Sequence, residues 1–196
     1  MSVLDLATAL LRPPEAKLSL VAITVVATLA ALLPRRGEGR RRLGTFLLIW
    51  GAGMATVMTL TSRLSYKPFG FHPELVTQCL TTMRSATHPE SVLNLLLLAP
   101  LAVGVVLLSG RLWPALLVTA GSSVSIELIQ NLTQLGGCEV DDVTRNIVGG
   151  FTAATCTWLM VRQRRSASAN EAPVTPKLPT QRPHLAIGPD SRSRER

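Results

Sequence analysis

The chain has 196 residues, of which 47% are hydrophobic, 16% charged and 4% aromatic, and its mean hydropathy is +0.32. Its formal net charge is +8 and its pI is about 10.7. This composition favours apolar helices in lipid over a soluble domain. The basic residues cluster just outside apolar segments instead of along one face, and this distribution argues against a nucleic-acid partner.

Five segments are long and apolar enough, or nearly so, to cross a membrane, which takes ~20 mostly apolar residues. They are residues 18–33, 43–62, 92–109, 112–130 and about 143–161. The first is short, so it either tilts little or recruits flanking residues. The five segments predict an all-α, polytopic membrane helix bundle with a transmembrane domain over residues 18–161.

The two ends of the chain differ from this domain. Residues 1–17 form an N-terminal segment in which "MSVLDLATALL" (1–11) can lie as a short interfacial helix. No A-x-A-like cleavage site precedes "PRRGEGRRR", so we interpret 18–33 as a span and not as a signal peptide. Residues 163–196 are rich in Pro, Ser and Arg, which predicts a disordered basic tail that rests on anionic lipid.

Basic residues beside the spans predict the orientation. One side carries Arg35, Arg36, Arg40, Arg41, Arg42, Arg111, Arg162, Arg164 and Arg165, and the other carries Arg12, Lys17, Arg63, Lys67, Arg84 and Arg145. We therefore expect a multi-pass plasma-membrane protein with the N-terminus outside, the C-terminus cytoplasmic, and loops 63–91 and 131–142 facing outward. If 18–33 does not span, only the N-terminus changes side.

The long outer loop holds several local signals. Thr87 and Glu90 have the spacing of a capping box for the third span. His72 and His88 could ligate a metal, but nothing fixes their spacing, so we assign no metal and no cofactor. Cys79 and Cys138 fall in outer loops and are a candidate disulfide, because such a bond persists outside the cytoplasm. Cys156, in the last span, is expected to pack as a small apolar thiol.

Polar side chains also occur near the outer ends of three spans. Glu127 and Gln130 are three residues apart and share a helix face with Ser123. If that helix ends near Leu132, Glu127 lies ~7.5 Å below its end. A carboxylate at that depth is costly unless it is protonated, paired or hydrated.

The last span has a similar face, with Asp142, Asn146, Gly149 and Ala153 at four- and three-residue steps. Asn94 lies near the outer end of the third span. We therefore predict an outward-facing polar pocket between spans three, four and five. The candidate ligand-binding residues are Asn94, Glu127, Gln130, Asp141, Asp142 and Asn146.

Each of these residues also has a structural interpretation. Asp141 or Asp142 can cap the last span. Asn94 and Asn146 can bond between helices, and Arg145 can extend to lipid headgroups.

The ordered set "NLLLLAP" (94–100), "ELIQ" (127–130) and "DDVTRNIVGG" (141–150) resembles the VanZ-like family of small bacterial membrane proteins. The chain departs from the family pattern at Leu98, Ala102, Gly136 and Glu139, where an aromatic residue, Gly, Arg and Asp are usual. If that Arg binds an anion, Arg145 or Arg84 would have to replace it. The resemblance implies a polytopic membrane protein, and the family's name-giving members look like determinants of resistance to the glycopeptide teicoplanin.

Three functions remain open. The first is a non-enzymatic envelope protein that binds a lipid-linked or cell-wall ligand in the polar pocket. The second is a membrane enzyme acting on a lipid-linked phosphate, in which Glu127 and Asp142 form an acid–base pair or the acids hold a divalent ion. The third is a small transporter in which Glu127 carries a proton. The sequence has no Walker or Rossmann glycine pattern, and it leaves the catalytic residues and the oligomeric state unassigned.

Overall fold

The computed structural model describes residues 12–33, 39–61, 90–135 and 140–170 of the chain. Within these ranges every regular element is a helix, as the sequence predicts. The elements are α2 (Pro14–Leu32), α3 (Gly39–Thr56), the π-helical turn η1 (Val57–Thr61), α6 (Glu90–Leu97), α7 (Ala99–Ser109), α8 (Leu112–Leu132) and α9 (Val140–Asn170).

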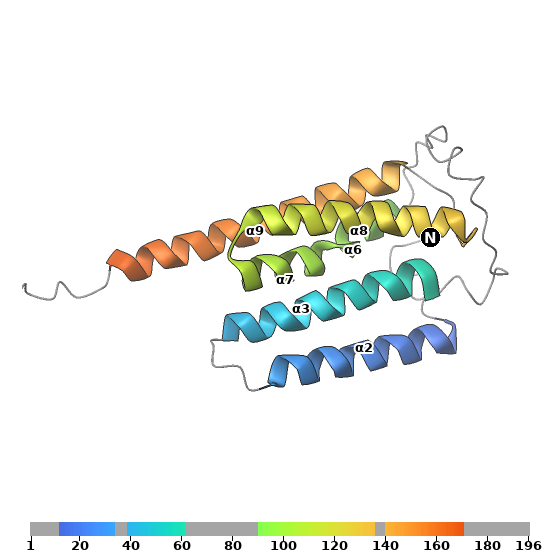
Figure 1. Cartoon of the computed structure of the whole chain (residues 1–196), viewed down its shortest axis with the longest axis horizontal. Coiled ribbons are helices and arrows are strands. Elements are labelled where there is room, and N and C mark those ends of the chain that lie inside the picture. Colours follow the sequence, from blue (N-terminus) through green and yellow to red (C-terminus); the bar gives the residue numbers. More distant parts are fainter. Residues whose placement is uncertain (1–11, 34–38, 62–89, 136–139, 171–196) are drawn as a thin grey trace, which may run out of the picture.

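The helices run up and down in one elongated bundle (Figure 1). α3 packs between α2 and α7, and α9 packs against α6, α7 and α8. Four stretches have the length and apolar composition to cross a membrane: Pro14–Leu32, Gly39–Leu60, Val92–Ser109 and Leu112–Leu132. α9 does not meet that criterion within the described residues, because its first two turns are polar and Arg162, Arg164 and Arg165 follow its apolar part. The chain is a multi-pass membrane protein.

Two helices are longer than their apolar segments. α2 begins at Pro14, where a missing N–H costs nothing, and so recruits the polar residues Glu15 and Lys17. α9 continues to Asn170, so the prediction of disorder is wrong for residues 163–170. The reason is local, because this stretch has no Gly or Pro and includes Gln and Arg, which favour helix. Segments 1–11 and 171–196 lie outside the described residues.

The third span is broken at Leu98, where the sequence predicts a continuous helix. Pro100 has no N–H to donate to the carbonyl of Leu96, so the helix is interrupted near that carbonyl. Leu98 has φ −95° and ψ 0°, and its carbonyl accepts a 3.0 Å bond from the N–H of Ala102. The break separates α6, which packs on α9, from α7, which packs mainly on α3 and α9.

Glycines allow α3 and α7 to approach closely. A Cβ on Gly51 would lie 2.5 Å from the backbone nitrogen of Leu101, and a Cβ on Gly104 would lie 2.5 Å from that of Leu48. In a bilayer the hydrophobic effect does not drive helices together, so such contacts hold them by dispersion. α7, α8 and α9 meet in a similar way through small buried side chains, among them Ala102, Ala115 and Ala154.

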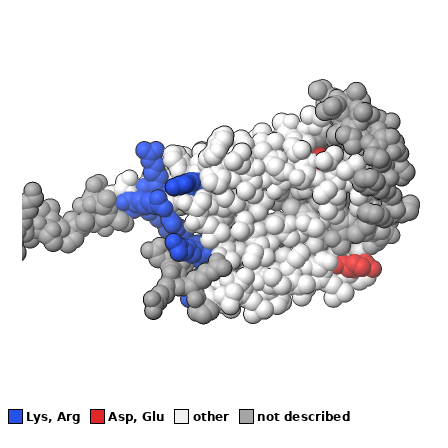
Figure 2. Space-filling model, in the orientation of Figure 1, with Lys and Arg blue, Asp and Glu red and all other residues white. Residues whose placement is uncertain are grey.

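The two ends of the bundle differ in charge. Arginines gather where α3 begins, where α7 turns into α8, and where α9 ends (Figure 2). The five acidic residues among those described occur toward the opposite end: Glu15, Glu90, Glu127, Asp141 and Asp142. We call the first the basic end and the second the polar end. The candidate ligand-binding residues lie toward the polar end.

Candidate functional site

The last three turns of α8 present a buried polar stripe. Ser123, Glu127 and Gln130 follow at steps of four and three residues, so they share one face of the helix. All three are buried, and the side chain of Glu127 is only 4% exposed. α8 ends at Leu132, so Glu127 lies about one turn inside the end of a membrane-spanning helix. An acidic side chain in that position marks a functional candidate.

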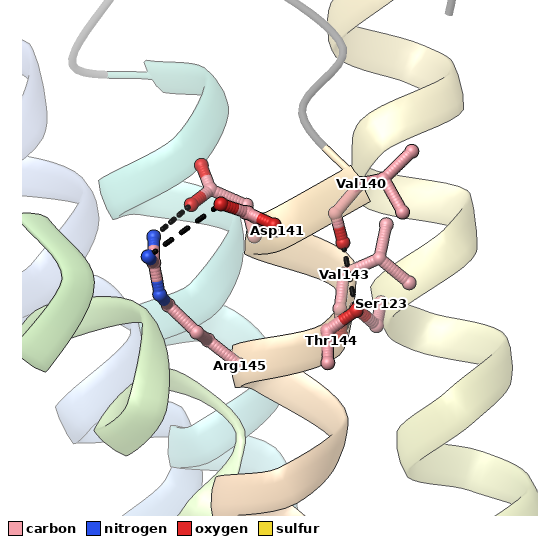
Figure 3. A network of polar contacts seen from close by, with 7 residues as sticks. Ser123, Val140, Asp141, Val143, Thr144 and Arg145 are labelled. Atoms are coloured by element: carbon pink, nitrogen blue, oxygen red, sulfur yellow. Dashed lines mark hydrogen bonds and ion pairs between the residues drawn. The ribbon is translucent and has the colours of Figure 1, made fainter. Parts of the chain in front are cut away.

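α8 runs antiparallel to α9, and two contacts set their register. The Ser123 hydroxyl donates a 3.2 Å hydrogen bond to the carbonyl of Val143 in the first turns of α9 (Figure 3). Two turns deeper, Gly150 of α9 lies against the side chain of Thr119. Glu127 is one turn nearer the polar end than Ser123, and α9 begins only three residues before Val143. Glu127 is therefore level with the beginning of α9.

Gln130 is bonded to η1, a helical turn that the sequence does not predict as part of the site. Its side-chain amide donates a 2.9 Å hydrogen bond to the carbonyl of Thr59 in η1. The last carbonyls of a helix lack partners within that helix, so Gln130 satisfies one of them. π-helical turns often occur at functional sites. No sequence signal could have found this contact, because a backbone carbonyl is common to every residue.

Asn146 is the most buried of the candidate residues, with 1% of its surface exposed. Gly149 and Gly150 follow it by three and four residues, so the direction of Asn146 lies between theirs. Gly149 lies against the carbonyl of Leu95 in α6, and Gly150 against Thr119 in α8. Asn146 is thus directed between α6 and α8. Among the described residues, no group donates a hydrogen bond to its Oδ1.

Asn94 joins the site from α6. Its side chain is half-buried, and it precedes Leu95, whose carbonyl touches Gly149. Asn94 therefore lies on the stretch of α6 that contacts α9. Four residues later, Leu98 is fully buried against Ala55 of α3.

Asp141 and Asp142 make a different set of contacts. The guanidinium of Arg145 lies 3.7 Å from a carboxylate oxygen of each, and all three side chains are partly exposed. Arg145 extends from α9 away from α8 (Figure 3). Since α9 begins at Val140, neither aspartate occupies the N-cap position, and both instead complement the dipole from within the first turn. Arg145 pairs with the aspartates instead of only reaching to headgroups.

Other predicted features fall elsewhere. The candidate disulfide Cys79–Cys138, the histidines His72 and His88, the residue Thr87 of the capping box, and Gly136 and Glu139 lie outside the described residues. Cys156 is exposed on α9 and does not pack inside the bundle. In the described part of the chain, no three His, Cys, Asp or Glu side chains come together as metal ligands.

Four of the six candidate residues lie on three helices toward the polar end: Glu127 and Gln130 on α8, Asn146 on α9 and Asn94 on α6. Asp141 and Asp142 form an ion-pair cluster with Arg145 at the start of α9. Carboxylate and amide oxygens accept hydrogen bonds, and the Oδ1 of Asn146 is one such acceptor that no described group fills.

The fold and this polar region define a class, a small multi-pass helical membrane protein with polar side chains buried toward one end of its bundle. A family profile described as VanZ/LLP1 matches residues 43–161, which is more than half of the chain. The chain belongs to the VanZ/LLP1 family. Neither the curated proteins nor the solved structures include a match to it.

Proposed function

We propose that the polar end binds a lipid-linked or cell-wall-related ligand on the outer side of the plasma membrane. One observation carries the proposal: the Oδ1 of Asn146 is buried between α6 and α8, and no described group donates to it. A buried polar atom without a partner costs about 1–3 kcal/mol. A ligand donor that fills this position would recover that cost.

The surroundings support a ligand with several donors. Glu127 and Gln130 are buried one to two turns beyond Ser123, on the helix that packs against α9. Sugar hydroxyls and peptide N–H groups, the donors of cell-wall precursors, match such a set of acceptors. The family match supports a link to glycopeptide tolerance of the teicoplanin type.

The proposal requires the polar end to face outward. Seven of the arginines described gather at the opposite end, and basic residues are enriched on the cytoplasmic side of membrane proteins. That distribution supports an N-terminus outside and a C-terminus in the cytoplasm. Single cysteines introduced at Gln134 and at Ser166 would test it by labelling intact cells with a membrane-impermeant maleimide, in a chain whose own cysteines are replaced. We expect labelling at position 134 only, and labelling at position 166 only would overturn the orientation.

The ligand site is tested by two substitutions in the full-length protein. On this proposal, expression of the wild type should confer teicoplanin tolerance, and Asn146→Ala and Glu127→Gln should each abolish it while the amount of protein in the membrane stays the same. Thr152→Ala is the matched control, because Thr152 is exposed on α9 and bonds only to its own helix.

Two results would contradict the proposal. If Asn146→Ala and Glu127→Gln retain full tolerance, the polar end is not the binding site. If both are degraded and tolerance falls in proportion to protein level, the residues hold the fold together and do not bind the ligand. Activity of purified protein on a lipid-linked phosphate that needs added Mg²⁺ and is lost in Glu127→Gln would favour an enzyme instead.

A further inference from the structure

The basic end is the strongest charged feature that the proposed ligand site does not use. Three separate parts of the chain contribute to it, namely the start of α3, the turn between α7 and α8, and the last turns of α9 (Figures 1 and 2). The described arginines there are Arg40, Arg41, Arg42, Arg111, Arg162, Arg164 and Arg165. All the described acids occur toward the other end, so this charge is not neutralised by Asp or Glu from the described helices.

We propose that the basic end binds the phosphate of an anionic phospholipid headgroup. The arginines converge around the end of α7. Gly44, one turn after Arg40, packs against Leu107 and Leu108. On the other side, the guanidinium of Arg165 covers Gly110, where an added Cβ would lie 2.5 Å from Nη2. Arg40 and Arg165 therefore flank the same turn, which continues into Arg111.

One of these arginines has an unfilled hydrogen-bonding position. The Nε of Arg40 is buried, and no described residue accepts a hydrogen bond from it. A phosphate oxygen would supply the missing acceptor. Guanidinium groups bind phosphate through paired N–H donors, so several converging arginines suit a phosphate better than a neutral headgroup.

Two tryptophans place these arginines at the depth of the headgroups. Trp113, in the first turn of α8, is 67% exposed, and Trp158 of α9 packs, as Leu112 of α8 does, against the buried cluster that includes Ala115 and Ala154. Tryptophans are enriched at the membrane–water interface. Arg162 lies one turn beyond Trp158, with its guanidinium carbon 5.3 Å from the ring centroid. The arginines thus begin where the apolar surface ends, which favours a lipid over a nucleic acid.

The experiment titrates short-chain phosphatidylglycerol into the detergent-solubilised full-length protein and detects bound lipid by native mass spectrometry, with phosphatidylcholine as the reference. The double variant R162Q/R165Q should bind phosphatidylglycerol about 30-fold more weakly, about fivefold for each arginine near the surface. Phosphatidylcholine binding should not change. R162K/R165K, which keeps the charge but not the paired N–H donors of the guanidinium groups, should lose less affinity than R162Q/R165Q.

The matched control is R12Q/K17Q, which removes two positive charges from the polar end. It should bind phosphatidylglycerol as the wild type does. An equal loss in R12Q/K17Q and R162Q/R165Q would show that only net charge matters and would overturn the site. Unchanged binding in R162Q/R165Q would also overturn the site. Displacement of the lipid by a short single-stranded RNA at low concentration would overturn it as well, and would assign the surface to nucleic acid. Neither variant touches Asn146 or Glu127, so failure here leaves the proposed function standing.

Discussion

The α3–α7 interface and the α8–α9 interface both bring helices into close contact, but they do so with different side chains. α3 and α7 meet through glycines, and the atoms that approach one another are backbone and aliphatic carbon. α8 and α9 also meet through small residues, but their interface includes the polar residues Thr119, Ser123 and Asn146. The hydroxyl of Thr119, like the Oδ1 of Asn146, lacks a partner among the described residues.

This difference distinguishes an interface that only packs from one that also buries polar groups without partners. An interface that only has to hold helices together gains nothing from buried polar atoms without partners, since each one costs free energy of folding. Several threonines of the bundle avoid the cost by bonding to the carbonyl four residues earlier, as Thr24, Thr59 and Thr157 do. The α8–α9 interface does not avoid it at Thr119 and Asn146, and the proposed ligand site rests on the second of these.

The largest effect is expected from breaking the close approach of α3 and α7. Gly51→Leu would drive a side chain into the backbone of Leu101, so the helices must separate. We expect a loss of about 3 kcal/mol or more of folding free energy. Size-exclusion chromatography after heating in detergent would measure the loss as a lower melting temperature. Gly121→Leu is the control, because nothing lies within 4 Å of a Cβ at Gly121. If both variants melt like the wild type, glycine packing is not what holds α3 on α7.

A smaller loss is expected where the polar end is tied to η1. Gln130→Leu removes the donor to the Thr59 carbonyl and leaves that carbonyl buried, at a cost of about 1–3 kcal/mol. Unfolding in mixed detergent micelles measures the change. Thr56→Val is the control on the neighbouring turn, since its hydroxyl is exposed and bonds within α3. Equal stability of Gln130→Leu and the control would mean that this contact is dispensable.

Substitution of Asn146 should have the opposite effect on stability to substitution of Gln130. Asn146→Ala removes a buried acceptor that has no donor in the described structure, so stability should stay the same or rise by about 1 kcal/mol. The same variant should lose ligand-dependent tolerance. This combination distinguishes a binding residue from a structural one. A fall in stability comparable to that of Gln130→Leu would identify Asn146 as an interhelical bonding residue instead.

The smallest effect is expected at Ser123. Its single interhelical bond to the Val143 carbonyl is 3.2 Å long, and such bonds in membrane proteins contribute about 0.6 kcal/mol. Ser123→Ala should therefore lower the unfolding free energy only slightly and leave tolerance intact. Ser125→Ala, on the exposed face of α8, provides the reference. A large loss of tolerance in Ser123→Ala, with stability unchanged, would extend the ligand site to this hydroxyl.

Some of the site could be predicted from the sequence because it depends on local periodicity. The steps from Ser123 to Glu127 and Gln130 place three polar residues on one helix face, and α8 does bury that face. The steps from Asn146 to Gly149 similarly indicate a face that approaches another helix. Helix ends were less predictable, since α9 begins earlier and ends later than its apolar segment.

The sequence by itself determined an all-α membrane protein with its basic residues denser at one end, because hydropathy and the order of charges along the chain need no knowledge of contacts. Only the tertiary structure decided which polar groups meet. The Thr59 carbonyl became the partner of Gln130, Arg145 paired with Asp141 and Asp142, and Asn146 was directed between α6 and α8. These outcomes depend on how close the helices pack and in what register, which is set by contacts between residues far apart in the sequence.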